Sequence, residues 1–407
     1  MLIGKYYDGL ELYRVDKLIY GKLLVPHLVL TTCRAGGGQR TDLEYLGNHQ
    51  SCEPAGHSHG LVAAVAPEDY HRSICTDFGL PAERCALLGT AANMRLAAFR
   101  ELSFRDLTVV AAVTGGVEGN AGRAGDPAYG WEGPNGYEAL PRTQEGEQLP
   151  APADNISDPS PNPNAGTINI LLFMNRALTP GALARSIITA TEAKSVALQE
   201  LNVNSRYSSG LATGTGTDQI GVAARLSDSL PALTSSGKHS KLGELIARSV
   251  IEALKEVLIR QNGMTAHRQS SVRIHLERFN ELSPGRFGLP KEILIDRVAD
   301  NLDPETADLF RHNYRGLFYD PMNVAQVAAM AAVRDKFKWG ILPSSVYAEV
   351  MARQGALLAV EAGGRLDLFE KYHLRLAQGP LENSDDGFLA MAAKALAMGF
   401  ADKWRKP

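Results

Sequence analysis

The feature that most constrains the fold lies between Gly166 and Leu258, where short apolar runs alternate with long amphipathic stretches. GTINILLFMN (Gly166–Asn175) and IGVAAR (Ile220–Arg225) contain β-branched residues and have the length of buried strands. The stretch after each run has helical periodicity. Strands that alternate with helices predict an α/β or α+β layered sandwich with a mixed sheet.

Both helices have marked starts. Thr179 can cap the first, and Pro180 suits its first helical position. Ser240 can cap the second, predicted over Lys241–Leu258, whose Glu244 and Arg248 form a solvated i,i+4 pair. Apolar runs earlier in the chain predict further strands, and helices are expected between them. These strands are Leu24–Leu30, Gly60–Ala66 and Leu107–Gly116, and the helices are Pro67–Gly79 and Ala91–Leu102.

The stretch Gly125–Gly166 is rich in Pro, Gly, Asn and Asp and has little periodicity, which predicts a long loop. A loop of this length is either a lid or a linker without a function of its own. Around Arg260–Ser271 the sequence changes to Ala-rich helical segments. We therefore predict a catalytic domain over 1–262 and an all-helical C-terminal extension over 263–407.

Composition excludes several classes of protein. The chain has 407 residues, 44% hydrophobic and 21% charged, with a net charge of −3, so no basic field favours nucleic acid or an anionic membrane. No uncharged apolar run approaches the roughly 18 residues of a membrane helix. The N-terminus lacks the order of a signal peptide, and the four cysteines form no CxxC pair. Reduced thiols and a cytoplasmic location are expected.

Lys194 is out of place on its helix. At roughly 100° per residue it lies about 20° from Leu183, inside the apolar face, whereas Glu192 lies about 180° away and should be solvated. A lysine on a buried face either extends its ammonium group out to water or needs a partner, because a buried unpaired charge is costly. The partner would be a carboxylate such as Asp218, or a carbonyl that Lys194 polarises.

The stretch GLATGTGTDQIG (Gly210–Gly221) crowds hydroxyls, glycines and a carboxylate before a strand. No GK[ST] follows and no long helix opens, so it is neither a phosphate loop nor a dinucleotide fingerprint. His239 precedes a helix start, where it could stabilise an oxyanion, act as a general base, or be a plain surface histidine. His57 and His59 could form half of a metal site, but no third ligand has supporting spacing, so no metal is predicted.

Together these segments resemble the adenosylcobinamide amidohydrolases of corrinoid salvage, over roughly residues 20–260. The resemblance is carried by NAGRAGDPA (Asn120–Ala128), by the run from Gly166 to Gly210, by LATGTGTDQI (Leu211–Ile220) and by GKHSKLGELIARSVIEALKE (Gly237–Glu256). Weaker echoes are TTCRAGGG, GNHQS and GTAANM. The C-terminal extension lies outside the family core.

The resemblance implies hydrolysis of the amide that joins aminopropanol to the corrin ring, a linear, non-peptide C–N bond. Cobalt would arrive within the corrinoid substrate, so neither a protein-bound cofactor nor a protein-held metal is implied, and a homo-oligomer is compatible with this reading. The catalytic candidates are Asp218, His239, Lys194 and Glu192. The substrate-binding candidates are Asn120, Arg123, Thr213, Gly214, Thr215, Gly216, Thr217 and Lys241.

Two mechanisms remain open at this point. Water could attack directly, with Asp218 or His239 as base and with Lys194 or the helix start at Lys241 stabilising charge. Alternatively, a threonine or serine hydroxyl could be the nucleophile, namely Thr213, Thr215 or Thr217, activated by His239 or Lys194. The competing functions are a non-catalytic corrinoid carrier or sensor and, less well supported, an ATP-dependent kinase or transferase.

Overall fold

The computed structural model describes residues 1–51, 66–128, 130–134, 136–140, 166–227, 229–283, 285–378 and 381–403. The described chain divides into two compact units. The first takes in the described residues of 1–125, 166–203 and 211–264. The second takes in those of 126–140, 204–210 and 265–403, so two short segments from before residue 263 belong with the C-terminal region.

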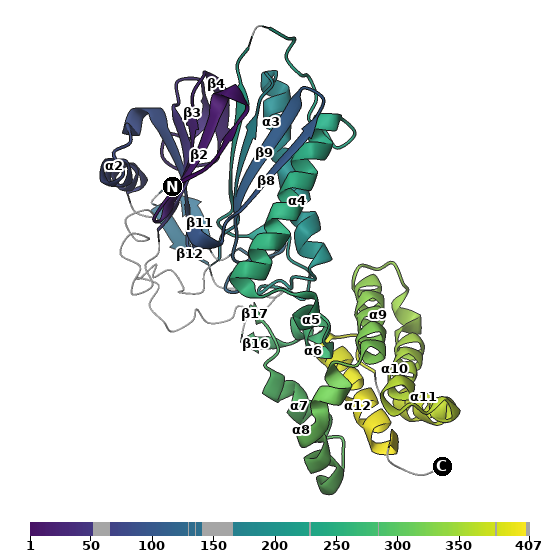
Figure 1. Cartoon of the computed structure of the whole chain (residues 1–407). Helices are drawn as coiled ribbons and strands as arrows, with labels where there is room; N and C mark the ends of the chain where they lie inside the picture. The colour runs from purple at the N-terminus through teal and green to yellow at the C-terminus, as the bar shows by residue number, and fades with distance from the viewer. Residues whose placement is uncertain are drawn as a thin grey trace. The chain divides into compact units, whose positions relative to one another are not determined.

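The first unit contains two sheets (Figure 1). The five-stranded sheet has the order β1-β2-β3-β6-β7, and its strands are β1 (Leu2–Tyr6), β2 (Leu10–Val15), β3 (Leu18–Leu23), β6 (Tyr45–Gln50) and β7 (Cys85–Thr90). The six-stranded sheet has the order β5-β4-β15-β13-β9-β8, and its strands are β5 (Gly38–Arg40), β4 (His27–Thr31), β15 (Gln219–Arg225), β13 (Asn169–Met174), β9 (Leu107–Thr114) and β8 (Ala98–Phe104). Both sheets are mixed, because β13 pairs with β15 and β6 pairs with β7 in parallel while their other pairs are antiparallel.

The central strand β13 is buried on both faces, and its side chains alternate between two cores. Ile170, Leu172 and Met174 pack in the core beneath the long helices, whereas Leu171 and Phe173 pack in the core between the two sheets. This two-sided burial explains why the sequence of β13 is a continuous apolar run rather than an alternating one.

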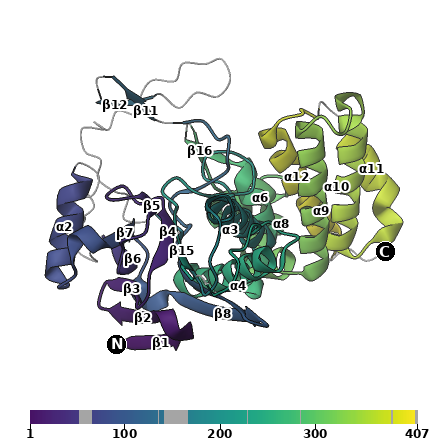
Figure 2. The ribbon, with the colours of Figure 1, turned by 90° about the horizontal axis from the view of Figure 1, so that it is seen from above.

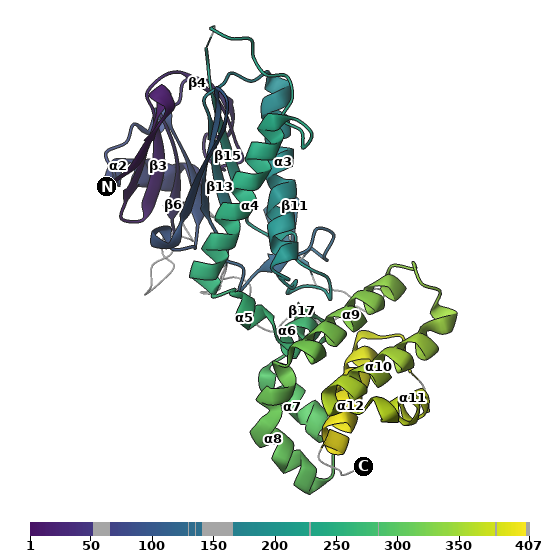
Figure 3. The ribbon, with the colours of Figure 1, turned by 45° about the vertical axis from the view of Figure 1, so that its right-hand side comes forward.

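Helices α3 (Pro180–Glu200) and α4 (Lys241–Asn262) lie side by side against one face of the six-stranded sheet (Figure 3). Their predicted caps are confirmed, because the Thr179 and Ser240 hydroxyls accept hydrogen bonds from the amides of Ala182 and Gly243. Helix α2 (Pro67–Asp77) packs through Tyr70, Ile74 and Cys75 on side chains of the five-stranded sheet (Figure 2). The first unit is thus layered helix, sheet, sheet, helix pair, and the predicted layered α/β class is confirmed.

Some sequence expectations were wrong. Residues 91–102 do not form a helix: only a short 3₁₀ turn (Met94–Leu96) occurs there, and Ala98–Phe104 is strand β8. Strand β8 pairs with β9 along its whole length, so cross-strand pairing overrides the helical propensity of residues such as Ala98 and Leu102. The loop after Gly125 contains a hairpin, β11 (Gly130–Gly133) with β12 (Gly136–Ala139). Most of the strand expected at Gly60–Ala66 lies outside the described residues.

The second unit is mainly helical, as predicted for the C-terminal extension. Its core is formed by the long helices, and α10 (Tyr347–Gly363) packs against α9 (Pro321–Lys338), α11 (Phe369–Ala377) and α12 (Asp385–Lys403) (Figure 2). The Gly363 and Gly399 backbones meet where α10 crosses α12, an approach that side chains would block. The other α-helices described in the second unit are α5 (Ala266–Gln269), α6 (Val272–Leu276), α7 (Lys291–Ala299) and α8 (Pro304–Phe318), and β16 (Glu281–Ser283) and β17 (Arg286–Phe287) form a small hairpin.

Across the described ranges, no helix is both long and apolar enough to cross a bilayer.

Candidate functional site

The glycine- and hydroxyl-rich stretch forms a tight turn at the start of strand β15. Gly214–Thr215 is the short strand β14, which pairs with β10 (Ala121–Gly122). The chain reverses at Gly216 and Thr217, and Asp218 follows immediately before β15. We call residues Gly214–Asp218 the hydroxyl turn. It lies at the ends of the parallel strands β13 and β15 where both strands begin.

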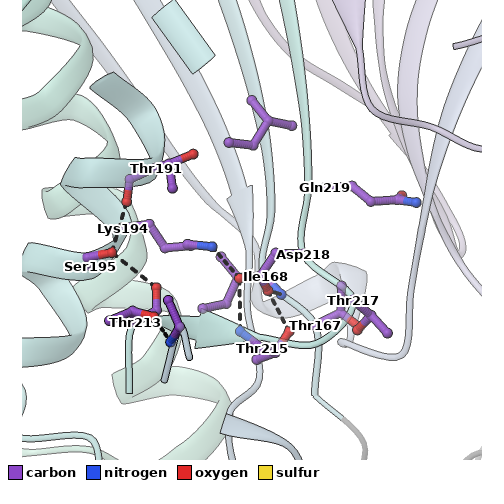
Figure 4. Close-up of polar contacts among 12 residues, drawn as sticks. Thr167, Ile168, Thr191, Lys194, Ser195, Thr213, Thr215, Thr217, Asp218 and Gln219 are labelled. Carbon is purple, nitrogen blue, oxygen red and sulfur yellow. Dashed lines mark hydrogen bonds and ion pairs between the residues drawn. The ribbon is translucent and has the colours of Figure 1, made fainter. Parts of the chain in front are cut away.

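Asp218 is the centre of the hydroxyl turn (Figure 4). Its Oδ1 accepts hydrogen bonds from the Ile168 amide at 2.9 Å and from the Thr215 hydroxyl at 2.5 Å. Its Oδ2 accepts from the Thr215 amide at 2.9 Å and from the ammonium group of Lys194. With both oxygens engaged and only 9% of the side chain exposed, the carboxylate is fixed in position.

Lys194 reaches Asp218 from helix α3, and its side chain is 10% exposed. The predicted position on the buried face is therefore confirmed. Of the alternatives for this lysine, the carboxylate partner is the one observed, and the ammonium group does not extend out to water. A buried ion pair of this kind is stable only if further hydrogen bonds satisfy the remaining polar atoms, and the donors around Asp218 fulfil that condition for the carboxylate.

Gly214 makes room for the ion pair. A Cβ atom at this position would lie 2.6 Å from the Lys194 Nζ and would also collide with the Asp218 carboxylate. Glycine is therefore required at position 214 because the side chains of Lys194 and Asp218 approach its backbone closely, in addition to the suitability of glycine for a turn.

The three threonines of this stretch have different partners. Thr215 alone donates its hydroxyl to Asp218. The Thr213 hydroxyl accepts from the Ala124 amide at 2.9 Å, and the Thr217 hydroxyl lies 2.6 Å from that of Thr167. A hydroxyl nucleophile needs a base within hydrogen-bond reach, so Thr215 is the threonine whose geometry fits that role.

A buried network of amides lies behind Asp218, and sequence reasoning did not single it out. The Asn169 side chain donates to the Asn48 Oδ1 at 2.8 Å and to the Gly89 carbonyl, and its own Oδ1 accepts from the Gln219 amide. Asn48 in turn donates to the Thr114 hydroxyl at 2.8 Å. The available signal was an asparagine inside the apolar run of β13, together with the short motifs GNHQS and GTAANM that supply Asn48 and Gly89.

The structure does not bring His239 or Lys241 to the hydroxyl turn. Lys241 lies over the Phe104 ring, 4.8 Å from its centroid, at the hairpin end of β8 and β9. Asp218 is next to Ile168, at the opposite end of β9, where Thr114 pairs with Asn169. Helix α4 spans this separation, about 33 Å at roughly 1.5 Å per residue.

This corrects the expectation that His239 lies beside Asp218. His239 is exposed and instead lines a cavity of about 470 Å³ with Arg185 and Lys238. Chain order had suggested proximity, but β15 and the segment after it carry the chain to the other end of the sheet. Glu192 faces solvent as its helical position predicted, and it pairs with Lys238 at 3.0 Å.

Asn120 and Arg123 flank β10, the strand that pairs with the hydroxyl turn. The Asn120 Oδ1 is buried and has no hydrogen-bond partner among the described residues. Arg123 is exposed. Both therefore flank the strand that pairs with the hydroxyl turn, although they are far from it in the sequence.

His57 and His59 lie outside the described residues. Within the part of the chain that the structure describes, no three His, Cys, Asp or Glu side chains are grouped so that they could hold a metal ion. Cys33, Cys75 and Cys85 are free thiols.

Comparison with known proteins identifies the family. Residues 3–266 match the family described as adenosylcobinamide amidohydrolase. An uncharacterised protein of Methanocaldococcus jannaschii is 36% identical over 225 residues, which cover 54% of this chain and 79% of that protein. A Methanosarcina mazei protein named adenosylcobinamide amidohydrolase is 39% identical over 98 residues, which cover 22% of this chain and 46% of the relative. The family match ends where the C-terminal helical region begins.

Proposed function

The chain belongs to the adenosylcobinamide amidohydrolase family, and on that premise we propose that it hydrolyses the aminopropanol amide of adenosylcobinamide. The products are adenosylcobyric acid and 1-aminopropan-2-ol, and the acid re-enters coenzyme B12 assembly. The observation that supports this function is the buried Lys194–Asp218 ion pair, held against a hydroxyl at the hydroxyl turn. We place the reaction in the cytoplasm, where free thiols such as Cys33 persist.

Amide hydrolysis needs a nucleophile, a base that takes its proton, and a proton for the departing amine. We assign the base to Asp218, since its Oδ1 already accepts the Thr215 hydroxyl. The proton taken by Asp218 is then delivered to the leaving amine. Lys194 balances the charge of the carboxylate and holds it in the orientation that the transfer requires.

Two routes share this base. In the first, the Thr215 oxygen attacks the amide carbonyl and forms an ester, which water then hydrolyses. In the second, Asp218 activates a water molecule that attacks directly. Thr215→Val separates them: the first route requires complete loss of turnover and an ester on Thr215 that mass spectrometry detects in wild type. In the second route, turnover persists at a reduced rate.

The substrate is a broad corrinoid with polar amide side chains, so its site needs hydrogen-bonding groups around the base. We assign substrate contacts to Asn120 and Arg123, which flank the strand paired with the hydroxyl turn, and to the exposed rim of that turn. Asn120→Ala should raise KM more than it lowers kcat. Cobalt enters with the substrate, and no protein-bound cofactor is invoked.

The decisive experiment is mass spectrometry of adenosylcobinamide incubated with purified protein and no nucleotide. We expect adenosylcobyric acid from wild type, and a loss of about 10²–10⁴-fold in Asp218→Asn, the range that general bases contribute. Asp106→Asn is the matched control, because it removes an exposed carboxylate that pairs with Arg176 in the same unit. If the protein binds intact adenosylcobinamide without hydrolysing it, its function is that of a corrinoid carrier and not of an enzyme. A product that appears only with ATP would indicate a transferase.

A further inference from the structure

Three buried polar side chains interrupt the apolar core between the two sheets of the first unit. Asn169, Asn48 and Thr114 are at most 3% exposed and lie on β13, β6 and β9. Each continues a row of inward-facing apolar side chains on its strand, such as Leu171 and Phe173 on β13. A buried polar group is costly unless it is hydrogen-bonded, so the partners of these three side chains matter.

Asn169 is the centre of this polar network and bonds to both sheets. Its Nδ2 donates to the Asn48 Oδ1 at 2.8 Å and to the Gly89 carbonyl at 2.9 Å, both in the five-stranded sheet. Its Oδ1 accepts from the Gln219 amide at 3.2 Å, in the six-stranded sheet. The Gly89 amide donates in turn to the Gln219 Oε1 at 2.9 Å. Side chains from β13 and β15 therefore hold the Gly89 backbone by both its carbonyl and its amide.

The same network borders Asp218 along the chain. The Ile168 amide, which donates to the Asp218 Oδ1 at 2.9 Å, directly precedes Asn169. The Gln219 amide directly follows Asp218, and it is shared between the Asn169 Oδ1 and the Ile168 carbonyl, each at 3.2 Å. Asn169 thus fixes both a backbone donor to the carboxylate and the backbone that carries the carboxylate.

We propose that Asn169 is a positioning residue for the hydrolysis, whose amide sets the place of Asp218. Its side chain is fully buried, so it acts through Asp218 and not by contact with the substrate. The kinetic part of this proposal rests on the proposed function, whereas the structural part does not. The proposal also gives the motifs GNHQS and GTAANM, which supply Asn48 and Gly89, a role in the activity.

The test compares two asparagines at opposite ends of strand β13 in the full-length protein. Asn169→Leu roughly keeps the shape of the side chain and removes its three hydrogen bonds. Asn175→Leu is the matched control, because the Asn175 side chain accepts from the Thr108 amide and donates to the Asp106 carbonyl, at 2.7 Å each. Turnover of adenosylcobinamide gives kcat and KM for each variant. Tm and hydrogen exchange, the latter by mass spectrometry, are measured on the same preparations.

We expect Asn169→Leu to lower kcat about 10- to 100-fold with a smaller change in KM, because a displaced base loses the reaction geometry but not the substrate contacts. The amides that donate to the base, those of Ile168 and Thr215, should exchange about tenfold faster or more. Asn175→Leu should leave kcat and these amides near wild type and speed exchange at residues 106–108 instead.

A milder pair of variants decides if Asn169→Leu does not fold. Thr114→Val removes the acceptor of the Asn48 amide, and Thr189→Val removes the donor to the Ser236 carbonyl, each a hydrogen bond of 2.8 Å. Thr114 and Thr189 are 3% and 2% exposed, so the two variants should lower Tm comparably. Thr114→Val alone should lower kcat, by about 3- to 10-fold, which is the worth of one hydrogen bond.

A wild-type kcat in Asn169→Leu, whether or not KM rises, would overturn the proposal. Equal losses of kcat in the variant and its control would overturn it as well, and the same criteria apply to the threonine pair. If wild type shows no hydrolysis, the proposed function fails, and the exchange comparison alone decides whether Asn169 holds Asp218 in place.

Discussion

Glu192 and Lys194 are two residues apart on helix α3, and each forms an ion pair, yet the two pairs differ in every other respect. The Lys194–Asp218 side chains are 10% and 9% exposed, and Asp218 has three further donors. Glu192 and its partner Lys238 are 47% and 59% exposed. The comparison shows that burial and additional donors, rather than an ion pair as such, distinguish a candidate catalytic group from ordinary surface charge.

The largest effect should come from breaking the buried pair. Lys194→Met leaves the Asp218 carboxylate buried without its cation, a change that costs about 3–5 kcal/mol of unfolding free energy. Turnover of adenosylcobinamide should also fall, because the Asp218 carboxylate loses the group that orients it as the base. Chemical denaturation and steady-state kinetics on the same preparation measure both effects.

Asp218→Asn is the companion to that variant. It keeps the size of the side chain but leaves the Lys194 ammonium buried without its anion and turns an NH2 group toward hydrogen-bond donors, so stability should fall by about 3–5 kcal/mol, as in Lys194→Met, and turnover should be lost to a similar extent. If both Lys194→Met and Asp218→Asn kept wild-type turnover, the reaction would not take place at the hydroxyl turn.

His27 extends the contrast to a buried group that pairs with no carboxylate among the described residues. Its ring bonds Tyr7 and the Val25 carbonyl, and burial, together with the Arg225 charge, lowers the pKa of His27 to about 4. The unfolded chain binds this proton more readily, so stability should fall as pH drops from about 6.5 to about 4, by roughly 3 kcal/mol in all. Unfolding free energies of wild type and His27→Gln across this range test it, and an equally steep acid limb in the variant would count against it.

Gly214→Ala tests how tightly the buried pair is enclosed. The added methyl group would sit 2.6 Å from the Lys194 Nζ, so either the turn or the ion pair must shift, at a cost of about 1–3 kcal/mol. Turnover should drop with it. Gly181→Ala is the control: it lies in the first turn of the same helix as Lys194, and a Cβ there meets nothing within 4 Å. Equal losses of stability and turnover in both variants would show that the close packing at Gly214 is not the cause of the loss.

Glu192→Gln should have the smallest effect. An exposed ion pair contributes about 0–1 kcal/mol, and Glu192 does not contact the hydroxyl turn in the described structure. Its turnover should therefore stay far closer to wild type than that of Lys194→Met. A loss as large as that of Lys194→Met would place part of the site on the solvent side of α3.

The sequence was enough to predict the layers of the first unit near the site and the most unusual residue in it. Helical periodicity placed Lys194 on the buried face, and the apolar runs located β13 and β15, because both signals are local. Asp218 was one of two partners considered for the lysine, since helical periodicity gives the face of a residue but not what packs against that face.

What the sequence could not provide depends on strand order and direction. His239 is close to Asp218 in chain order but lies at the other end of the sheet, since β15 and α4 run in opposite directions along it. The amides of Asn48 and Asn169 meet only because β6 and β13, far apart in sequence, belong to facing sheets. The contact of Arg278 with Ser209 likewise joins distant parts of the chain.

The segment Asn204–Gly210, which belongs to the second unit, has a consequence for how the family can vary. Asn204, Ser205 and Ser209 are polar, and helices beyond the family match cover them. A family member that lacks those helices would expose this stretch to water and lose the partners of its amide and carbonyl groups. Such chains should have a shorter connection between the ends corresponding to Val203 and Ala212, so loop length at this one place should vary together with the presence of the C-terminal region.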